Sequence, residues 1–156
     1  YKKLALEYGN GDISFSPAIQ LLNIHQLDDL LKWMIEFSDG TFSDSDEEKG
    51  IVYVSWRAVV WYPTICRTDI APTDYKLSIA DKLSKSLDYF KPWKQVSHYY
   101  KNQIDSLRQN FLTDHERVFF QKAFIKYNDK QDQHRKRTTW RQLLPELEKS
   151  LTRSIL

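Results

Sequence analysis

Five charged or ionisable side chains fall on one face of a predicted helix, where they could follow the phosphates of a polyanion. They are Lys94, His98, Lys101, Asp105 and Arg108, at successive spacings of four, three, four and three residues. These spacings bring side chains to one side of an α-helix. A row of cations binds phosphates by releasing counterions, so its affinity falls with salt. The alternative is an ordinary solvated face in which Lys101 and Asp105 form an ion pair four residues apart.

A second basic cluster lies within residues 130–141 and is centred on residues 134–137. Such a cluster in a loop is typical of phosphate contacts or of part of a nuclear localisation patch. Its predicted anion contacts are Arg135, Lys136, Arg137 and Arg141. Trp140 and Tyr127 could stack on exposed bases beside it. Alternatively, Trp140 anchors the last helix in the core, because it directly follows a predicted helix cap.

An acidic segment over residues 42–50 contains two serines that resemble acid-directed phosphorylation sites. Ser43 is followed three positions later by Asp46, and Ser45 by Glu48. Phosphorylation there would add negative charge to an already acidic loop. The alternative is a solvated linker without modification.

Aromatic residues are abundant, at 14% of the chain, and some could form a partner-binding surface. Trp and Tyr are favoured at protein interfaces. The candidates are Tyr53, Trp56, Trp61 and Tyr99. Most aromatic side chains of a small domain are nevertheless needed in its core.

Catalytic and cofactor patterns are weak. Gly9 and Gly11 lack the third glycine and the strand-to-helix setting of a dinucleotide-binding turn. The four histidines are scattered and Cys66 is the only cysteine, which gives a metal site little support. Asp28 and Asp29 lie near a predicted helix start, where carboxylates favour the helix dipole without any catalytic role. We therefore expect no enzyme activity, no cofactor and no metal.

Charge is divided unevenly along the chain. Residues 1–75 hold 12 Asp/Glu and 6 Lys/Arg, a net charge of −6, whereas residues 76–156 hold 17 Lys/Arg and 9 Asp/Glu, a net charge of +8. A basic half predicts a polyanionic partner, unless the acidic half neutralises it within the molecule. With a mean hydropathy of −0.61 and one cysteine, we expect an intracellular protein without a membrane span. The absence of an initial Met suggests a piece of a longer protein.

The N-terminal half combines signals for strands and helix. Asn10-Gly11 between alternating apolar residues predicts a hairpin over residues 3–15. Ser16-Pro17 is typical of a helix start, and Leu27, Leu30, Leu31, Met34 and Phe37 extend an apolar helical face to a stop at residues 38–40. Residues 51–62 are rich in β-branched and aromatic residues, which favours a strand over a buried helix.

The C-terminal half has helical periodicity interrupted by two prolines. Pro92 predicts a break in the first helix, and Pro145 predicts a kink or a restart in the last. Capping boxes at Thr113–Glu116 and Thr139–Gln142 predict two further helix starts, separated by a polar loop over residues 128–137.

These signals predict a single α+β domain that is predominantly α-helical, with a small N-terminal antiparallel sheet packed on a C-terminal bundle of three to four helices. Its acidic half is mixed α/β (1–75) and its basic half is helical (76–156). The chain is predicted to be a non-enzymatic interaction module of a larger intracellular protein. Its basic cluster is typical of a nuclear localisation patch, which predicts that the protein could be nuclear. Its basic half would bind nucleic acid or another polyanion without strong sequence specificity. The alternative is a protein–protein adaptor that docks through the aromatic segment 51–62.

Overall fold

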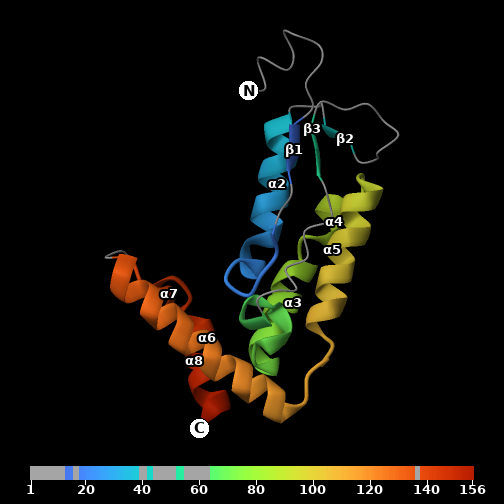
Figure 1. The fold of residues 1–156 in the computed structure, drawn as a ribbon. Coiled ribbons are helices and arrows are strands. Elements are labelled where there is room, and N and C mark those ends of the chain that lie inside the picture. The colour runs from blue at the N-terminus through green and yellow to red at the C-terminus, as the bar shows by residue number, and fades with distance from the viewer. Residues whose placement is uncertain (1–12, 16–17, 39–41, 44–51, 55–63, 136–137) are drawn as a thin grey trace.

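The chain is predominantly helical. The computed structural model describes residues 13–15, 18–38, 42–43, 52–54, 64–135 and 138–156. Its α-helices are α2 (Leu27–Ser38), α3 (Thr73–Ser84), α4 (Leu87–Phe90), α5 (Lys94–Leu107), α6 (Asp114–Arg135), α7 (Trp140–Leu143) and α8 (Pro145–Ile155). Short 3₁₀ turns occur at η1 (Ile24–Gln26), η2 (Thr64–Cys66) and η3 (Thr68–Ile70), and the strands are β1 (Ile13–Phe15), β2 (Phe42–Ser43) and β3 (Val52–Val54). Figure 1 shows the strands together at one end, and α6 running diagonally away from the end of α5.

The described strands form a parallel sheet, so the predicted antiparallel sheet is wrong. β3 lies in the middle and pairs in parallel with both β1 and β2. A parallel pair needs a long crossover connection, and the connection from β1 to β3 includes α2. The structure does not describe residues 3–12 of the predicted 3–15 hairpin. It also does not describe the later part of the predicted 51–62 strand.

The first long helix begins later than the Ser16-Pro17 signal predicts. The side chain of Asn23 accepts a hydrogen bond from the Gln20 backbone N–H at 2.8 Å and donates one to the Ala18 carbonyl at 2.8 Å. This side-chain bonding holds residues 18–23 in a non-helical turn, because Asn competes with the helical backbone for its hydrogen bonds. The predicted end is confirmed, since α2 stops at Ser38.

The proline breaks and both capping boxes are confirmed. α4 ends at Phe90 and α5 starts at Lys94, on either side of Pro92, whereas α8 starts at Pro145 itself. At the start of α6, Thr113 Oγ1 accepts from the Glu116 N–H at 3.3 Å, and the Glu116 carboxylate accepts from the Thr113 N–H at 2.9 Å. A second reciprocal pair joins Thr139 and Gln142 at the start of α7.

The predicted polar loop over residues 128–137 is helical as far as Arg135, because α6 continues through it. Two side chains explain the difference. Asn128 is buried and its amide donates to the Phe124 carbonyl one turn earlier at 2.9 Å. Asp132 accepts from the Trp140 backbone N–H at 3.0 Å and thereby ties α7 to this part of α6. The polar residues 128–135 are therefore helical, and the hydrogen bonds of Asn128 and Asp132 stabilise this part of α6.

One apolar core joins the helices. Tyr100 of α5 is fully buried and its hydroxyl donates to the Leu83 carbonyl of α3 at 2.8 Å. Other fully buried core side chains are Leu21, Leu27, Leu31, Ile70, Phe90, Ile104, Phe124, Leu147 and Leu151. Among the helices described, none is both long and apolar enough to cross a bilayer.

Candidate functional site

The predicted cation row on α5 is on a helix, but two of its cations already have partners. Lys101 pairs with Asp105 at 2.5 Å, as the alternative interpretation expected. Arg108, which caps the end of α5, donates to Ser84 Oγ of α3 at 3.1 Å and lies 3.5 Å from an Asp81 oxygen. Lys94 and His98 are exposed. These contacts are typical of an ordinary solvated helix face.

Arg141 of the second predicted cluster makes contacts within the fold, to Asp129 and Trp140. Its guanidinium forms a two-pronged hydrogen bond with the Asp129 carboxylate and lies 4.7 Å from the centre of the Trp140 ring. The Trp140 side chain is buried, packs edge-on against Phe124 and donates from Nε1 to Asp129 at 2.9 Å. The hydrogen bonds from Arg141 lower the pKa of Asp129, and the same contact raises the pKa of Arg141. Trp140 therefore anchors the last helices in the core, as the structural alternative expected.

The remaining members of that cluster follow α6. His134 is exposed on the last turn of this helix and Arg135 is its final residue. Lys136 and Arg137 lie outside the described residues.

Because α6 continues to Arg135, it aligns a row of lysines that sequence reasoning did not select. Lys122, Lys126 and Lys130 are spaced four residues apart and are all exposed. A rise of 1.5 Å per residue places the first and last about 12 Å apart along the helix. Among the described residues their ammonium groups form no ion pair. The spacing was visible in the sequence, but the predicted loop from residue 128 concealed that Lys130 continues the row.

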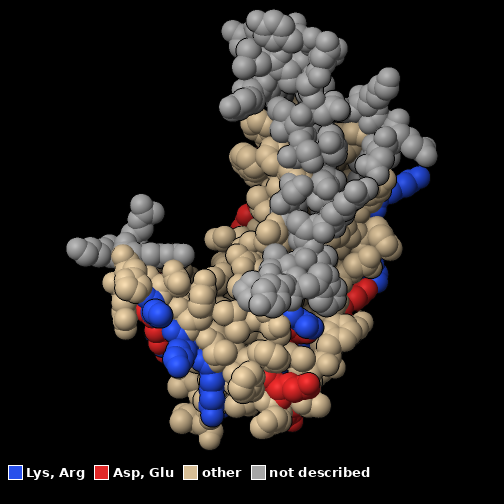
Figure 2. All heavy atoms as spheres, in the orientation of Figure 1, with Lys and Arg blue, Asp and Glu red and all other residues tan. Residues whose placement is uncertain are grey.

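A shallow groove runs beside these lysines. Its volume is about 590 Å³ and it is lined by Lys122, Ile125, Lys126, Asp129, Lys130 and Gln133 of α6 and by Ile155 of α8. The isoleucines supply an apolar floor and the lysines a basic rim. The carboxylate of Asp129 already binds Arg141. Figure 2 shows basic groups along the lower left of the molecule, over α6, with some acidic atoms between them.

Two aromatic side chains stand exposed on the same helix. Phe119 is 64% exposed and Tyr127 is 47% exposed. At about 100° per residue, Lys126 and Lys130 each lie within about 20° of Phe119 around the helix axis, and Tyr127 about 80° away. We call Phe119, Lys122, Lys126, Tyr127 and Lys130 the lysine face of α6.

The predicted partner and phosphorylation residues receive little support as surface sites. Tyr53 belongs to β3, but its side chain lies outside the description, as do Trp56 and Trp61. Tyr99 is half-buried and packs against the core, and burial raises its pKa to about 12. Ser43 belongs to β2 and is buried, whereas Ser45 lies outside the described residues.

The acidic and basic halves of the chain touch. Asp28 of α2 is buried, and its carboxylate lies 3.8 Å from the ammonium groups of both Lys32 and Lys82. The Lys82 ammonium group also donates a hydrogen bond to the His25 carbonyl at 2.6 Å. Asp74 of α3 pairs with Arg153 of α8 at 3.2 Å. Part of the charge division is therefore neutralised within the molecule, as that alternative predicted.

His25 and Cys66 are both half-buried. Burial lowers the pKa of His25, with a further contribution from Lys82, and burial raises the pKa of the Cys66 thiol. In the described part of the chain, no three His, Cys, Asp or Glu side chains gather as metal ligands would.

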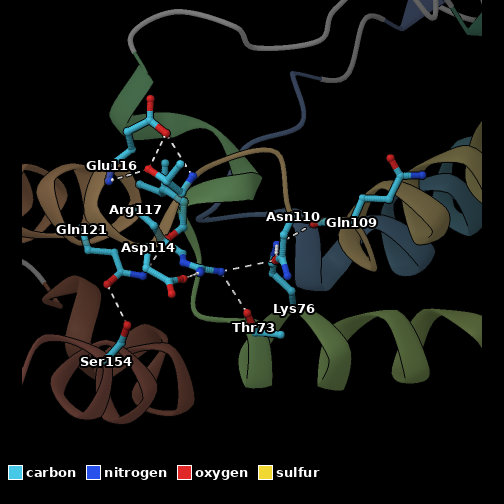
Figure 3. Close-up of polar contacts among 11 residues, drawn as sticks. Thr73, Lys76, Gln109, Asn110, Asp114, Glu116, Arg117, Gln121 and Ser154 are labelled. Atoms are coloured by element: carbon cyan, nitrogen blue, oxygen red, sulfur yellow. Dashed lines mark hydrogen bonds and ion pairs between the residues drawn. The ribbon is translucent and has the colours of Figure 1, made fainter.

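A polar network around the buried Lys76 joins α3, the connection after α5, and α6 (Figure 3). Lys76 of α3 is 1% exposed, and its ammonium group donates to the Gln109 carbonyl at 2.7 Å and to Asn110 Oδ1 at 2.8 Å. Arg117 of α6 donates to the same Asn110 oxygen at 3.3 Å and to Thr73 Oγ1 at 2.9 Å. Burial lowers the pKa of Lys76, and the nearby Arg117 charge lowers it further.

Further along α6, Gln121 links three parts of the chain. It is fully buried, donates to the Ile70 carbonyl at 2.8 Å and accepts from Ser154 Oγ of α8 at 3.0 Å. Together with the Arg117 bond to Thr73, this contact fixes one side of α6 against η3, the start of α3 and α8, and leaves the lysine face outward.

Comparison with known proteins gives no match to a family model, to a curated protein or to a solved structure.

Proposed function

We propose that this chain is a non-enzymatic binding module that holds a polyanion, most directly nucleic acid, along the lysine face of α6. The observation that carries the proposal is the row Lys122, Lys126 and Lys130, exposed on one continuous helix without ion pairs among the described residues. Unpaired surface lysines keep their counterions available for exchange with phosphates, which is the source of sequence-independent affinity.

The predicted location of the site changes accordingly. Lys101 and Arg108 on α5 would have to leave Asp105 and Ser84 to bind a phosphate. Arg141 would have to leave Asp129. The lysines of α6 need to break no such contact, so phosphate binding costs less there.

The basic run after α6 extends this proposal. His134 and Arg135 end the helix, and Lys136 and Arg137 follow directly in the sequence. Further cations next to the row would add phosphate contacts and steepen the salt dependence. An intracellular and nuclear location, the adaptor role of segment 51–62 and phosphorylation at Ser45 stay predictions.

The test is fluorescence anisotropy with a labelled oligonucleotide at low and at physiological salt. Three phosphate contacts predict a slope of log affinity against log salt of about −2 for a single strand, because each contact contributes about −0.7. Raising the salt from about 50 to about 200 mM should then weaken binding roughly 18-fold. The K122E/K126E/K130E variant should lose binding and its salt dependence.

A matched variant on α5 serves as the control. K94E/K101E/R108E changes the net charge by the same amount on a different helix, so it measures the general effect of charge reversal. Circular dichroism of both variants checks that they fold. Equal losses in the two variants, or retained binding in the α6 variant, would contradict the proposed site.

A further inference from the structure

We infer that the lysine face of α6 is built for single-stranded nucleic acid rather than for a duplex; this inference rests on the proposed function and names its ligand class. The observation behind it is that exposed aromatic rings stand among the lysines. Phe119 and Tyr127 are 64% and 47% exposed, whereas Phe124 of the same helix packs in the core and is 1% exposed.

Phe119 faces the same ligand as the cations, and Tyr127 borders them, about 80° from Phe119 around the helix axis. Phe119 comes within about 20° of Lys126 and Lys130 around the helix axis, so a strand lying on these ammonium groups also meets its ring. Phe119 packs edge-on against Phe120, with ring centres 5.4 Å apart, which restrains the orientation of the exposed ring. Alternating cations and aromatic rings are the combination by which proteins hold unpaired strands.

A duplex cannot use these rings, because each base in it is covered on both faces by its neighbours. The lysines alone would contact duplex phosphates, and two hydrophobic side chains would be left against the solvated backbone. In a single strand the bases can turn outward and cover the rings. Stacking on an aromatic side chain then adds affinity for any base, since every base has a π-face.

The spacing fits a short piece of one strand. Phe119 and Tyr127 are eight residues apart, which is about 12 Å along the helix. That length matches the rise of three to four nucleotides at about 3.4 Å each in a stacked strand, and fewer when the strand is extended. The groove floored by Ile125 and Ile155 lies beside the lysines and offers a further apolar surface to an unstacked base.

The experiment compares labelled oligothymidine of about 20 nucleotides with the matching duplex and with polyglutamate, a polyanion without bases. We expect the single strand to bind more tightly than the duplex at equal salt, and polyglutamate to bind more weakly than either. Each ring replaced by alanine, in F119A and Y127A, should weaken single-strand binding at least about fivefold and leave duplex binding unchanged.

Two further variants separate stacking from general damage. F119W keeps an aromatic ring and should retain single-strand binding. F111A removes a side chain that is 60% exposed but lies before α6, and it should have no effect.

The outcomes separate this inference from the function on which it rests. If binding depends on Lys122, Lys126 and Lys130 but duplex and single strand bind equally and F119A and Y127A change nothing, the ligand is any polyanion and the inference is overturned. Preferred binding of polyglutamate would overturn it in favour of an acidic protein partner. If the lysine reversal leaves binding intact, the proposed function itself fails.

Discussion

Replacing Asp129 by alanine should destabilise the chain clearly more than removing an aspartate of an ordinary surface ion pair. Asp129 accepts from the Trp140 indole and from the Arg141 guanidinium, and these bonds attach α7 to α6. Asp105, which pairs with Lys101 on the outside of α5, is the matched control. Both replacements put alanine in place of aspartate within a helix, so the gain in helix propensity cancels between them.

The magnitude follows from the contacts. Without Asp129 the buried indole N–H loses its acceptor, which costs about 1–3 kcal/mol. The Arg141 pair, whose side chains are 40% and 35% exposed, adds about 0.5–1 kcal/mol after screening. The control loses an exposed pair worth about 0.3–0.5 kcal/mol. D129A should therefore be less stable than D105A by at least about 1 kcal/mol, or roughly 2–4 °C in melting temperature.

Urea denaturation followed by circular dichroism measures both variants. A difference below about 0.5 kcal/mol would refute the inference that Asp129 anchors Trp140, since that value is within the range of neutral surface changes. The pH dependence gives a second check. Because the folded-state pKa of Asp129 lies below its ordinary value of 3.8, its contribution is present above that value and is lost as the pH falls through the folded-state pKa.

Two other predictions concern the core. L147A changes a fully buried position of α8 and should lower the free energy of unfolding, measured by urea titration, by about 2–5 kcal/mol. The control L143A changes a residue of α7 that is 65% exposed, and it should change that free energy by less than about 0.5 kcal/mol. Equal effects of the two variants would mean that α8 is not packed as described. Burial raises the pKa of Tyr75 from its ordinary 10.0 to about 12, so between these values the folded state binds more protons and wild-type stability should fall as pH rises. Y75F should reduce that fall by up to about 1.4 kcal/mol per pH unit, and an unchanged slope would show that Tyr75 does not titrate in this way.

Features with local causes could be predicted from the sequence. The capping boxes at Thr113 and Thr139 and the interruptions at Pro92 and Pro145 depend on residues within one turn of each other, and all four are confirmed. The burial of Trp140 was likewise favoured by its place beside a cap.

Features that depend on distant partners could not be predicted. The parallel pairing of β1 with β3 joins segments on either side of α2, and no local pattern specifies its direction. The polar stretch after Asn128 resembles a loop until Asp129 and Asp132 receive partners from α7. Missing that part of α6 also concealed the lysine row, whose spacing has meaning only on a continuous helix.

The buried Lys76 network has a consequence for how the molecule opens. Each of its bonds crosses between elements: Lys76 lies on α3, its acceptors Gln109 and Asn110 follow α5, and Arg117 lies on α6. Separating α3 from the connection after α5 would leave the buried Lys76 ammonium group without its acceptors, so this opening is costly. We therefore expect the backbone amides of α3 and of the first turns of α6 to exchange with solvent in one cooperative unit, while the last turn of α6, beyond Asp132, frays independently. The lysine face ends at Lys130, between the Asp129 and Asp132 bonds to α7, and therefore lies wholly on the part of α6 that is held by the rest of the molecule.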